Sequence, residues 1–169
     1  MGEHVTAIQL NDEMKGALTG LQGRMQRLGV RGNFTRRENL HLTLAFIGEY
    51  PDPDDVIDVL ETVRFDPFSI CLEGIGSFGS LWWAGLSGSD ELKALTKRLR
   101  RALAEAGIPF DRKKFSPHIT LVRKPVCREG SIPEDILREL PEAEMTVDHI
   151  SLMRSDRGKH GMIYTELYP

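Results

Sequence analysis

The sequence of 169 residues predicts an α+β fold with antiparallel strand pairing, on three observations. Apolar residues recur at helical spacing in some segments and alternate with polar residues in others, as in half-buried strands. Several predicted strands follow one another with no helix between them, which favours antiparallel pairing over a doubly wound parallel sheet. No low-complexity linker divides the chain, so residues 1–169 are expected to form a single domain.

The first third of the chain is expected to run strand, helix, strand. An apolar run predicts a strand over residues 5–10. From Asn11, a favourable N-cap residue, apolar residues spaced by four and three predict a helix that ends near Gly29. A polar stretch over residues 31–39 then leads into an apolar strand over residues 40–47.

The middle of the chain is expected to hold two helices around a pair of strands. Two prolines open a helix over residues 51–63, and period-two alternation predicts a strand over residues 68–73. Three glycines within residues 74–79 predict a turn before a second strand over residues 81–86. Four leucines at steps of three and four then line the clearest helix, over residues 89–107.

The last third is expected to consist mostly of strands. An apolar segment predicts a strand over residues 115–123. A capping box, with Ser at the N-cap and Glu three residues later, predicts a short helix over residues 131–140. Residues 145–153 and 162–168 are expected to form two closing strands.

Composition excludes several classes of function. Lys and Arg number 22 and Asp and Glu 25, giving a net charge of −3, so coating of nucleic acid by bulk charge is not expected. No segment reaches the roughly 18 uninterrupted apolar residues of a membrane-spanning helix. Cys71 and Cys127 form no C-x-x-C pattern, so neither a disulfide framework nor a cysteine-built metal site is expected. A reducing cytoplasm is the expected location.

One short motif occurs twice. Residues 41–44 are His-Leu-Thr-Leu and residues 118–121 are His-Ile-Thr-Leu. In a strand, His and Thr two positions apart share one face, and the aliphatic residues share the other. Two such strands facing a cleft would present two imidazoles, able to act as general acid and general base. Their two hydroxyls could donate hydrogen bonds to an anion between them.

The candidate catalytic residues are therefore His41, Thr43, His118 and Thr120. A single histidine beside apolar strand residues is more often a hydrogen-bonded core or edge residue, and the repetition is what favours function. The two histidines have no cysteine or carboxylate near them at the spacing of metal ligands, so they are not expected to bind a metal ion. No metal and no cofactor are expected.

The chain resembles the 2H phosphoesterase superfamily in these motifs. Residues 39–48 are Asn-Leu-His-Leu-Thr-Leu-Ala-Phe-Ile-Gly and residues 116–123 are Ser-Pro-His-Ile-Thr-Leu-Val-Arg. Within that superfamily the chain is most similar to the RNA 2′,3′-cyclic phosphodiesterases, historically called 2′-5′ RNA ligases. The resemblance implies a bilobal fold with a pseudo-two-fold axis, a cleft between the lobes, and metal-independent hydrolysis of a cyclic phosphate to a 2′-phosphomonoester.

The same resemblance implies a role for each motif residue. His118 would activate a water for attack on phosphorus, and His41 would protonate the departing 3′ oxygen. Thr43 and Thr120 would hold the phosphate oxygens. Because the two histidines could exchange roles in the reverse reaction, the pair is better supported than the acid and base assignments within it.

Phe46 and Arg123 each stand five residues after a motif histidine. That offset would place them on the opposite face of a regular strand, so a bulge or a strand end must redirect them toward the histidines. The resemblance implies that Phe46 stacks on the nucleobase and that Arg123 binds the phosphate. The alternatives are a core position for Phe46 and a solvated charge for Arg123.

The expected partners are RNA ends or small nucleotides that carry a 2′,3′-cyclic phosphate, with no membrane partner and with a monomeric protein. Other cyclic phosphates, 2′-5′ linkages (including reverse ligation) and a non-catalytic RNA- or nucleotide-binding module are the alternatives. Tyr164 is expected to serve packing. Basic residues that flank the motifs could steer an RNA end toward the cleft: Arg36, Arg37, Lys113, Lys114 and Lys124.

Overall fold

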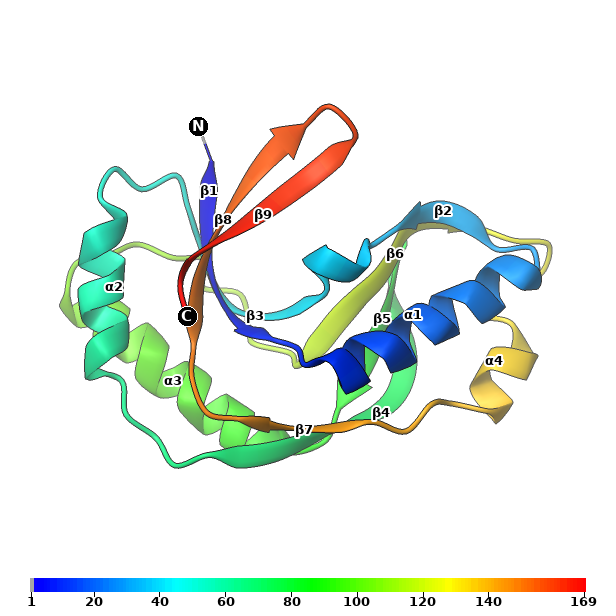
Figure 1. Cartoon of the computed structure of the whole chain (residues 1–169), viewed down its shortest axis with the longest axis horizontal. Helices are drawn as coiled ribbons and strands as arrows, with labels where there is room; N and C mark the ends of the chain where they lie inside the picture. Colours follow the sequence, from blue (N-terminus) through cyan, green and yellow to red (C-terminus); the bar gives the residue numbers. More distant parts are fainter. Residues whose placement is uncertain (1) are drawn as a thin grey trace.

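The computed structural model describes residues 2–169 and contains two antiparallel sheets with flanking helices (Figure 1). The first sheet has the strand order β3-β1-β8-β9 and the second has the order β2-β6-β5-β4-β7. The strands are β1 (Glu3–Gln9), β2 (Arg31–Phe34), β3 (His41–Gly48), β4 (Phe68–Phe78), β5 (Leu81–Leu86), β6 (His118–Val126), β7 (Glu144–Val147), β8 (Ser151–Gly158) and β9 (Gly161–Tyr168). The helices are α1 (Asp12–Arg27), α2 (Pro53–Thr62), α3 (Ser89–Glu105) and α4 (Glu134–Arg138), with a 3-10 turn η1 (Arg37–Asn39). The predicted α+β class with antiparallel pairing is confirmed.

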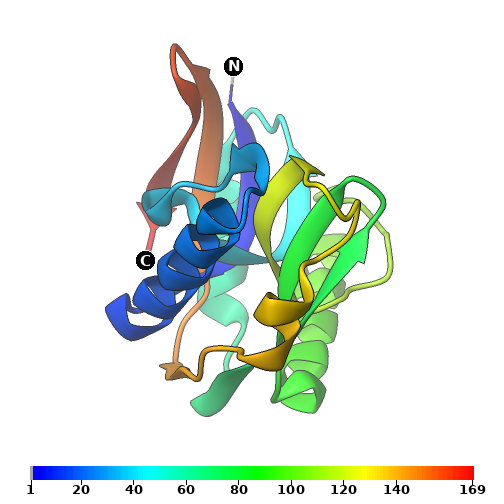
Figure 2. The same cartoon turned by 90° about the vertical axis from the view of Figure 1, so that its right-hand side faces the viewer.

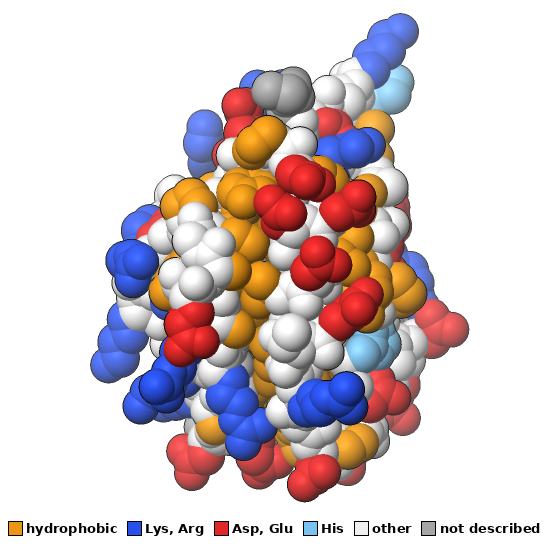
Figure 3. Space-filling model, turned by 90° about the vertical axis from the view of Figure 1, so that its left-hand side faces the viewer, with side chains coloured by type: hydrophobic (Ala, Val, Ile, Leu, Met, Phe, Trp, Pro, Cys, Tyr) orange, Lys and Arg blue, Asp and Glu red, His pale blue; other side chains and the backbone are white. Residues whose placement is uncertain are grey.

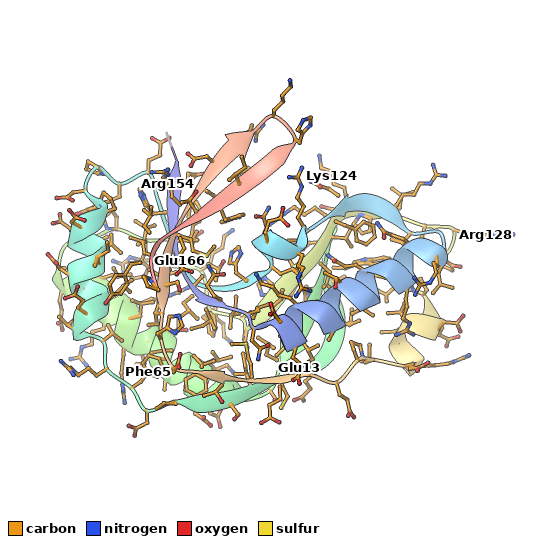
Figure 4. All side chains as sticks on the ribbon, viewed as in Figure 1. Glu13, Phe65, Lys124, Arg128, Arg154 and Glu166 are labelled. Carbon is orange, nitrogen blue, oxygen red and sulfur yellow. The ribbon has the colours of Figure 1, made fainter. Side chains whose placement is uncertain are left out.

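Each long helix packs against the sheet opposite to the one that it follows. Helix α1 leaves β1 of the first sheet but contacts β7 and α4, and its Glu13 carboxylate accepts a hydrogen bond from the backbone N of Glu144 on β7 (2.9 Å; Figure 4). Helix α3 leaves β5 of the second sheet but contacts β3 and α2. In Figure 2 the two sheets stand side by side. Because α1 and α3 each start at one sheet and pack against the other, the two sheets share one apolar core.

The inward faces of the two motif strands lie in that core. Leu42 and Leu44 of β3, and Ile119 and Leu121 of β6, are fully buried and belong to one apolar cluster. The alternation of His and Thr with aliphatic residues therefore orients both strands in the same way. The apolar faces pack inward, and the histidines and threonines point away from the core.

The expectation of a single strand over residues 145–153 is wrong. The segment contains β7, which pairs with β4 in the second sheet, and β8, which pairs with β1 in the first. Residues 148–150 carry the chain from one sheet to the other. At this crossing the alternation is interrupted only by the consecutive polar residues Asp148 and His149, and this short interruption marks the change of sheet.

Two further strands differ from expectation because of local chemistry. Strand β2 lies in the polar stretch of residues 31–39, for which no strand was expected, since an exposed edge strand needs few apolar residues. Strand β4 continues through Gly74 and Gly76 to Phe78. At Gly76 any Cβ would collide with the ring of Trp83, so glycine here permits a close cross-strand contact and does not mark a turn.

Two boundaries in the second half of the chain also shift. Strand β6 runs from His118 to Val126 and so begins three residues later than expected. Helix α4 is shorter than expected, and its N-cap is Pro133 with no side-chain capping bond, so the expected capping box is absent. Among residues 2–169, no helix has the length and apolar character needed to cross a membrane.

Candidate active site

The two repeated motifs meet in space. Strands β3 and β6, from different sheets, contact each other, and a cavity of about 370 Å³ lies along them. All six residues expected from the sequence line this cavity: His41, Thr43, Phe46, His118, Thr120 and Arg123. The tertiary structure thus brings together two groups that lie far apart in the chain.

Both histidines are held by the same kind of hydrogen bond. His41 Nδ1 lies 2.6 Å from the carbonyl oxygen of Asn39, and His118 Nδ1 lies 2.8 Å from that of Ser116. Because a carbonyl oxygen only accepts, each Nδ1 carries the proton, and each neutral ring keeps an unprotonated Nε2. His41 Nε2 is 3.0 Å from Thr43 Oγ1, whose hydroxyl donates to it. The two rings therefore share one tautomer, with Nε2 available for proton transfer.

Aromatic rings pack against both imidazoles. The ring of Tyr164 lies 4.8 Å from that of His41, centroid to centroid, and the edge of Phe78 meets His118 at 5.2 Å. Trp83 lies 6.2 Å from His118 on the same side as Phe78. Tyr164 packs as expected and also lines the cavity. The sequence did not identify Phe78, because its segment reads as a glycine-rich turn.

Burial changes the pKa of two groups in this site. Desolvation lowers the pKa of His41 below the ordinary value of 6.5, the hydrogen bond to Asn39 offsets part of this effect, and the charges of Lys15 and Arg123 lower the pKa further. Burial raises the pKa of Tyr164 above 10.0, so its phenol stays neutral. In the unliganded protein at neutral pH, His41 is therefore an uncharged base.

A bulge in each motif strand explains how the fifth residue reaches the cavity. The pairing of β3 with β1 skips Leu44, and the pairing of β6 with β5 skips Leu121. Each extra residue reverses the alternation, so Phe46 and Arg123 share the face of the motif histidines. The expectation that a bulge redirects Phe46 and Arg123 toward the histidines is confirmed. Phe46 is 39% exposed on the cavity wall, which rules out a core position.

The cavity is positively charged and, in the described part of the chain, has no acidic side chain in its wall. Its ionisable groups are Arg36, Arg123, Tyr164 and three histidines, of which His160 is the third. Exposed acidic residues gather elsewhere, including on α2 at the side seen in Figure 3. In a chain of net charge −3, such a wall favours an anionic ligand.

Of the five flanking basic residues, only Arg36 lines the cavity. Arg37, its neighbour, pairs instead with Asp12 (3.3 Å). The wall beyond the motifs comes from Val5 on β1, from β2 and the residues after it, from Asn39 and from the β8–β9 hairpin. The residues in this part that the sequence did not indicate are Val5, Asn33, Phe34, Thr35, Ser155, His160, Gly161 and Met162.

Asn39 connects the hairpin to the first histidine. Its side-chain amide donates to the carbonyl of Met162 (2.9 Å) on β9, while its own backbone carbonyl holds His41. Within residues 2–169, no group of three or more His, Cys, Asp or Glu side chains is placed to hold a metal ion. The cavity therefore offers imidazole, hydroxyl and guanidinium groups.

Comparison with known proteins agrees with this geometry. Residues 17–159 match the family model described as the 2′-5′ RNA ligase superfamily. A protein of Aeropyrum pernix named RNA 2′,3′-cyclic phosphodiesterase is 32% identical over 166 residues, covering 92% of this chain and 94% of that protein. A protein of Thermotoga maritima with the same name is 32% identical over 174 residues, covering 96% of this chain and 91% of that protein.

Solved structures give the same assignment. The structure of TT0787 of Thermus thermophilus has a TM-score of 0.76 and 28% identity, covering 98% of this chain and 94% of that one. The structure of E. coli LigT complexed with 3′-AMP has a TM-score of 0.79 and 25% identity, with the same coverage. The chain therefore belongs to the 2′-5′ RNA ligase superfamily, in the family of the RNA 2′,3′-cyclic phosphodiesterases.

Proposed function

We propose that this protein opens the 2′,3′-cyclic phosphate of an RNA end or a small nucleotide and leaves a 2′-phosphomonoester. One observation carries the proposal. Two imidazoles, each from a His-x-Thr strand, line one cavity and hold Nδ1 against a backbone carbonyl, which leaves Nε2 for proton transfer. Among residues 2–169, no acidic side chain lines this cavity. Since every group in the proposed mechanism lies in one chain, the mechanism is consistent with the expected monomer.

The proposed reaction needs one base and one acid. His118 Nε2 takes a proton from water, and the water oxygen forms a new bond to phosphorus as the bond between phosphorus and the 3′ oxygen breaks. Protonated His41 gives its Nε2 proton to that leaving oxygen. The 3′ hydroxyl and a 2′-phosphomonoester result, and solvent returns both rings to their starting protonation states.

Thr43, Thr120 and Arg123 would stabilise the negative charge on phosphorus. In the free protein the Thr43 hydroxyl donates to His41 Nε2. When His41 is protonated this nitrogen can no longer accept, so the hydroxyl becomes free to donate to a phosphate oxygen. Thr120 and the Arg123 guanidinium would bind the remaining oxygens, and Phe46 would stack on the base. Protonation of His41 and capture of the phosphate are thereby linked.

The deciding experiment is ³¹P NMR of a 2′,3′-cyclic nucleotide incubated with the protein and excess EDTA. The expected product is the 2′-phosphomonoester. A 3′-phosphate would reverse the assignment of the leaving group and leave the site intact. If neither a cyclic mononucleotide nor a short cyclic-ended RNA is hydrolysed, a different cyclic phosphate, a 2′-5′ linkage or a binding function without turnover would replace the proposal.

The pKa of His41 is expected to rise when a phosphate is bound. In the free protein burial holds it below 6.5. An anion beside the ring favours the imidazolium, which raises the pKa. Binding therefore takes up a proton, and affinity increases as the pH falls toward the free pKa. The histidine ring resonances, followed against pH with and without adenosine 2′-monophosphate, measure both values. A free pKa above 6.5, or one that the nucleotide leaves unchanged, would contradict this prediction.

Arg36 is expected to contribute to the binding of RNA chains longer than the terminal nucleotide. It lines the cavity with no carboxylate partner within salt-bridge distance in the described chain. Arg36→Gln should lower kcat/KM for a short cyclic-ended RNA by about 3- to 5-fold, the size of an exposed charge contact, with a smaller effect on a cyclic mononucleotide. Arg37→Gln is the matched control, because Arg37 lies outside the wall. Equal losses in both variants would assign the effect to general surface charge.

A further inference from the structure

Each of the two bulges receives a side-chain hydrogen bond from a helix. The carbonyl oxygen of Leu44 accepts hydrogen bonds from Arg100 Nη2 (3.1 Å) and Nε (3.3 Å), and Arg100 lies on α3. The carbonyl oxygen of Leu121 accepts from Gln22 Nε2 (2.9 Å), on α1, and also from the backbone N of Thr35 (3.0 Å). Each helix crosses from one sheet to the other, and each supplies a donor to the bulged strand that it reaches.

These bonds matter because a bulge interrupts the pairing of the strand. Leu44 and Leu121 are skipped in the register at the bulge that follows each motif threonine, and both are fully buried. Each hydrogen bond from a helix side chain to a buried bulge carbonyl favours the bulged strand over a regularly paired one. At Leu121, Gln22 supplies the second hydrogen bond beside that from the Thr35 backbone N. In the regular strand, Phe46 and Arg123 would turn away from the cavity.

Both side chains also hold a second segment of the site. Gln22 Nε2 donates to the carbonyl of Thr35 (2.9 Å), which lines the cavity. Arg100 Nη1 donates to the carbonyl of Lys113 (2.6 Å), shortly before the residues that hold His118. Gln22 is only 6% exposed, although it is polar and lies on a helix that is otherwise buried through apolar side chains. Helix packing alone would favour an apolar residue at this position.

We propose that Gln22 and Arg100 are a matched pair of positioning residues for the substrate-binding groups. Gln22 holds the bulge of β6 and so directs Arg123 toward the phosphate. Arg100 holds the bulge of β3 and so directs Phe46 toward the base. The inference rests on the proposed function for the identity of the ligand, and on the structure for the two sets of contacts.

A crossed double-mutant cycle tests the pairing. Gln22→Met and Arg100→Met remove the donors and keep an unbranched side chain, and each is combined in turn with Arg123→Ala and with Phe46→Ala. Losing a buried hydrogen bond should weaken kcat/KM by roughly 5- to 100-fold, through a higher KM. The effect of Gln22→Met should fall to within about 2-fold once Arg123 is absent, and that of Arg100→Met once Phe46 is absent. In the other two combinations, Gln22→Met with Phe46→Ala and Arg100→Met with Arg123→Ala, the fold losses in kcat/KM should multiply.

Two neighbouring substitutions serve as controls. They are Gln26→Met on α1 and Arg101→Met on α3. Both side chains are exposed and neither reaches a bulge; Arg101 pairs instead with Glu105 (3.4 Å). Both variants should leave kcat/KM within about 2-fold of the parent, as is usual at surface positions. Arg100→Lys keeps one donor for Leu44 and should recover part of the loss.

The possible outcomes are distinct. A role in stability alone would lower the amount of folded enzyme, and thus kcat, with KM unchanged; that result, or multiplicative behaviour in all four combinations, would overturn the proposal. Should a methionine variant fail to fold, Gln22→Ala or Arg100→Ala, which also removes the donor, replaces it in the cycle. The same cycle measured on the Kd of adenosine 2′-monophosphate needs no turnover. It therefore decides the positioning role even if the proposed reaction fails.

Discussion

Replacing either motif histidine by alanine is expected to reduce turnover of a 2′,3′-cyclic nucleotide by about 10²- to 10⁴-fold, the usual contribution of a placed proton-transfer group. His41 and His118 present equivalent Nε2 atoms to one cavity, so each variant removes one half of the proton transfer. Initial rates followed by ³¹P NMR or chromatography measure the loss. His149→Ala is the control, since His149 is exposed outside the cavity and bonded to Asp148.

A sulfur-substituted substrate separates the acid from the base. A cyclic phosphorothiolate with sulfur in place of the 3′ oxygen has a leaving group that needs no proton. His41→Ala should recover most of its lost activity on this substrate, and His118→Ala should not. Recovery by His118→Ala instead would exchange the two roles. A loss below about 5-fold in both alanine variants would remove the histidines from the mechanism.

The second largest effect is expected at the threonines. Thr120→Val keeps the shape of the side chain and removes the hydroxyl that would donate to a phosphate oxygen in the transition state. A donor of this kind is worth about 10²–10³ in kcat. Thr43→Val should lose a similar amount and should also remove the hydrogen bond to His41 Nε2.

The serine variants are the matched controls for the threonines. Thr120→Ser and Thr43→Ser keep the hydroxyl and should retain activity within about 10-fold of the parent. Single-turnover rates under saturating substrate isolate the chemical step from binding. If the valine variants instead kept kcat and raised KM alone, the hydroxyls would contribute equally to ground state and transition state, and their proposed role would be wrong.

Much of the cavity was predictable because its chemistry repeats within two short strands. A strand alternates faces, so His41 with Thr43, and His118 with Thr120, could each be placed on one exposed face from spacing alone. The positions of Phe46 and Arg123 even required an irregular strand, and bulges occur at Leu44 and Leu121. These inferences succeeded because each depends only on neighbours along the chain.

Other parts of the cavity depend on groups brought together from distant segments. Phe78 packs against His118 because β4 continues past its glycines, and a close approach to Trp83 requires the glycine at position 76. Arg36 reaches the wall while Arg37 pairs with Asp12. Nothing in the local sequence distinguishes these two arginines, because only the path of the chain sets which of them faces the ligand.

The α+β class, the buried and exposed faces of the motif strands, and the residue types of the proposed chemistry all followed from the order of the residues. The meeting of β3 and β6 at one cavity, and the change of sheet between β7 and β8, became visible only in three dimensions. The same is true of Gln22 and Arg100, which reach the bulges from helices that cross between the sheets. The difference is one of range, because side-chain alternation is a property of a few consecutive residues, whereas sheet partners and the donors to a buried carbonyl are set by packing of the whole chain.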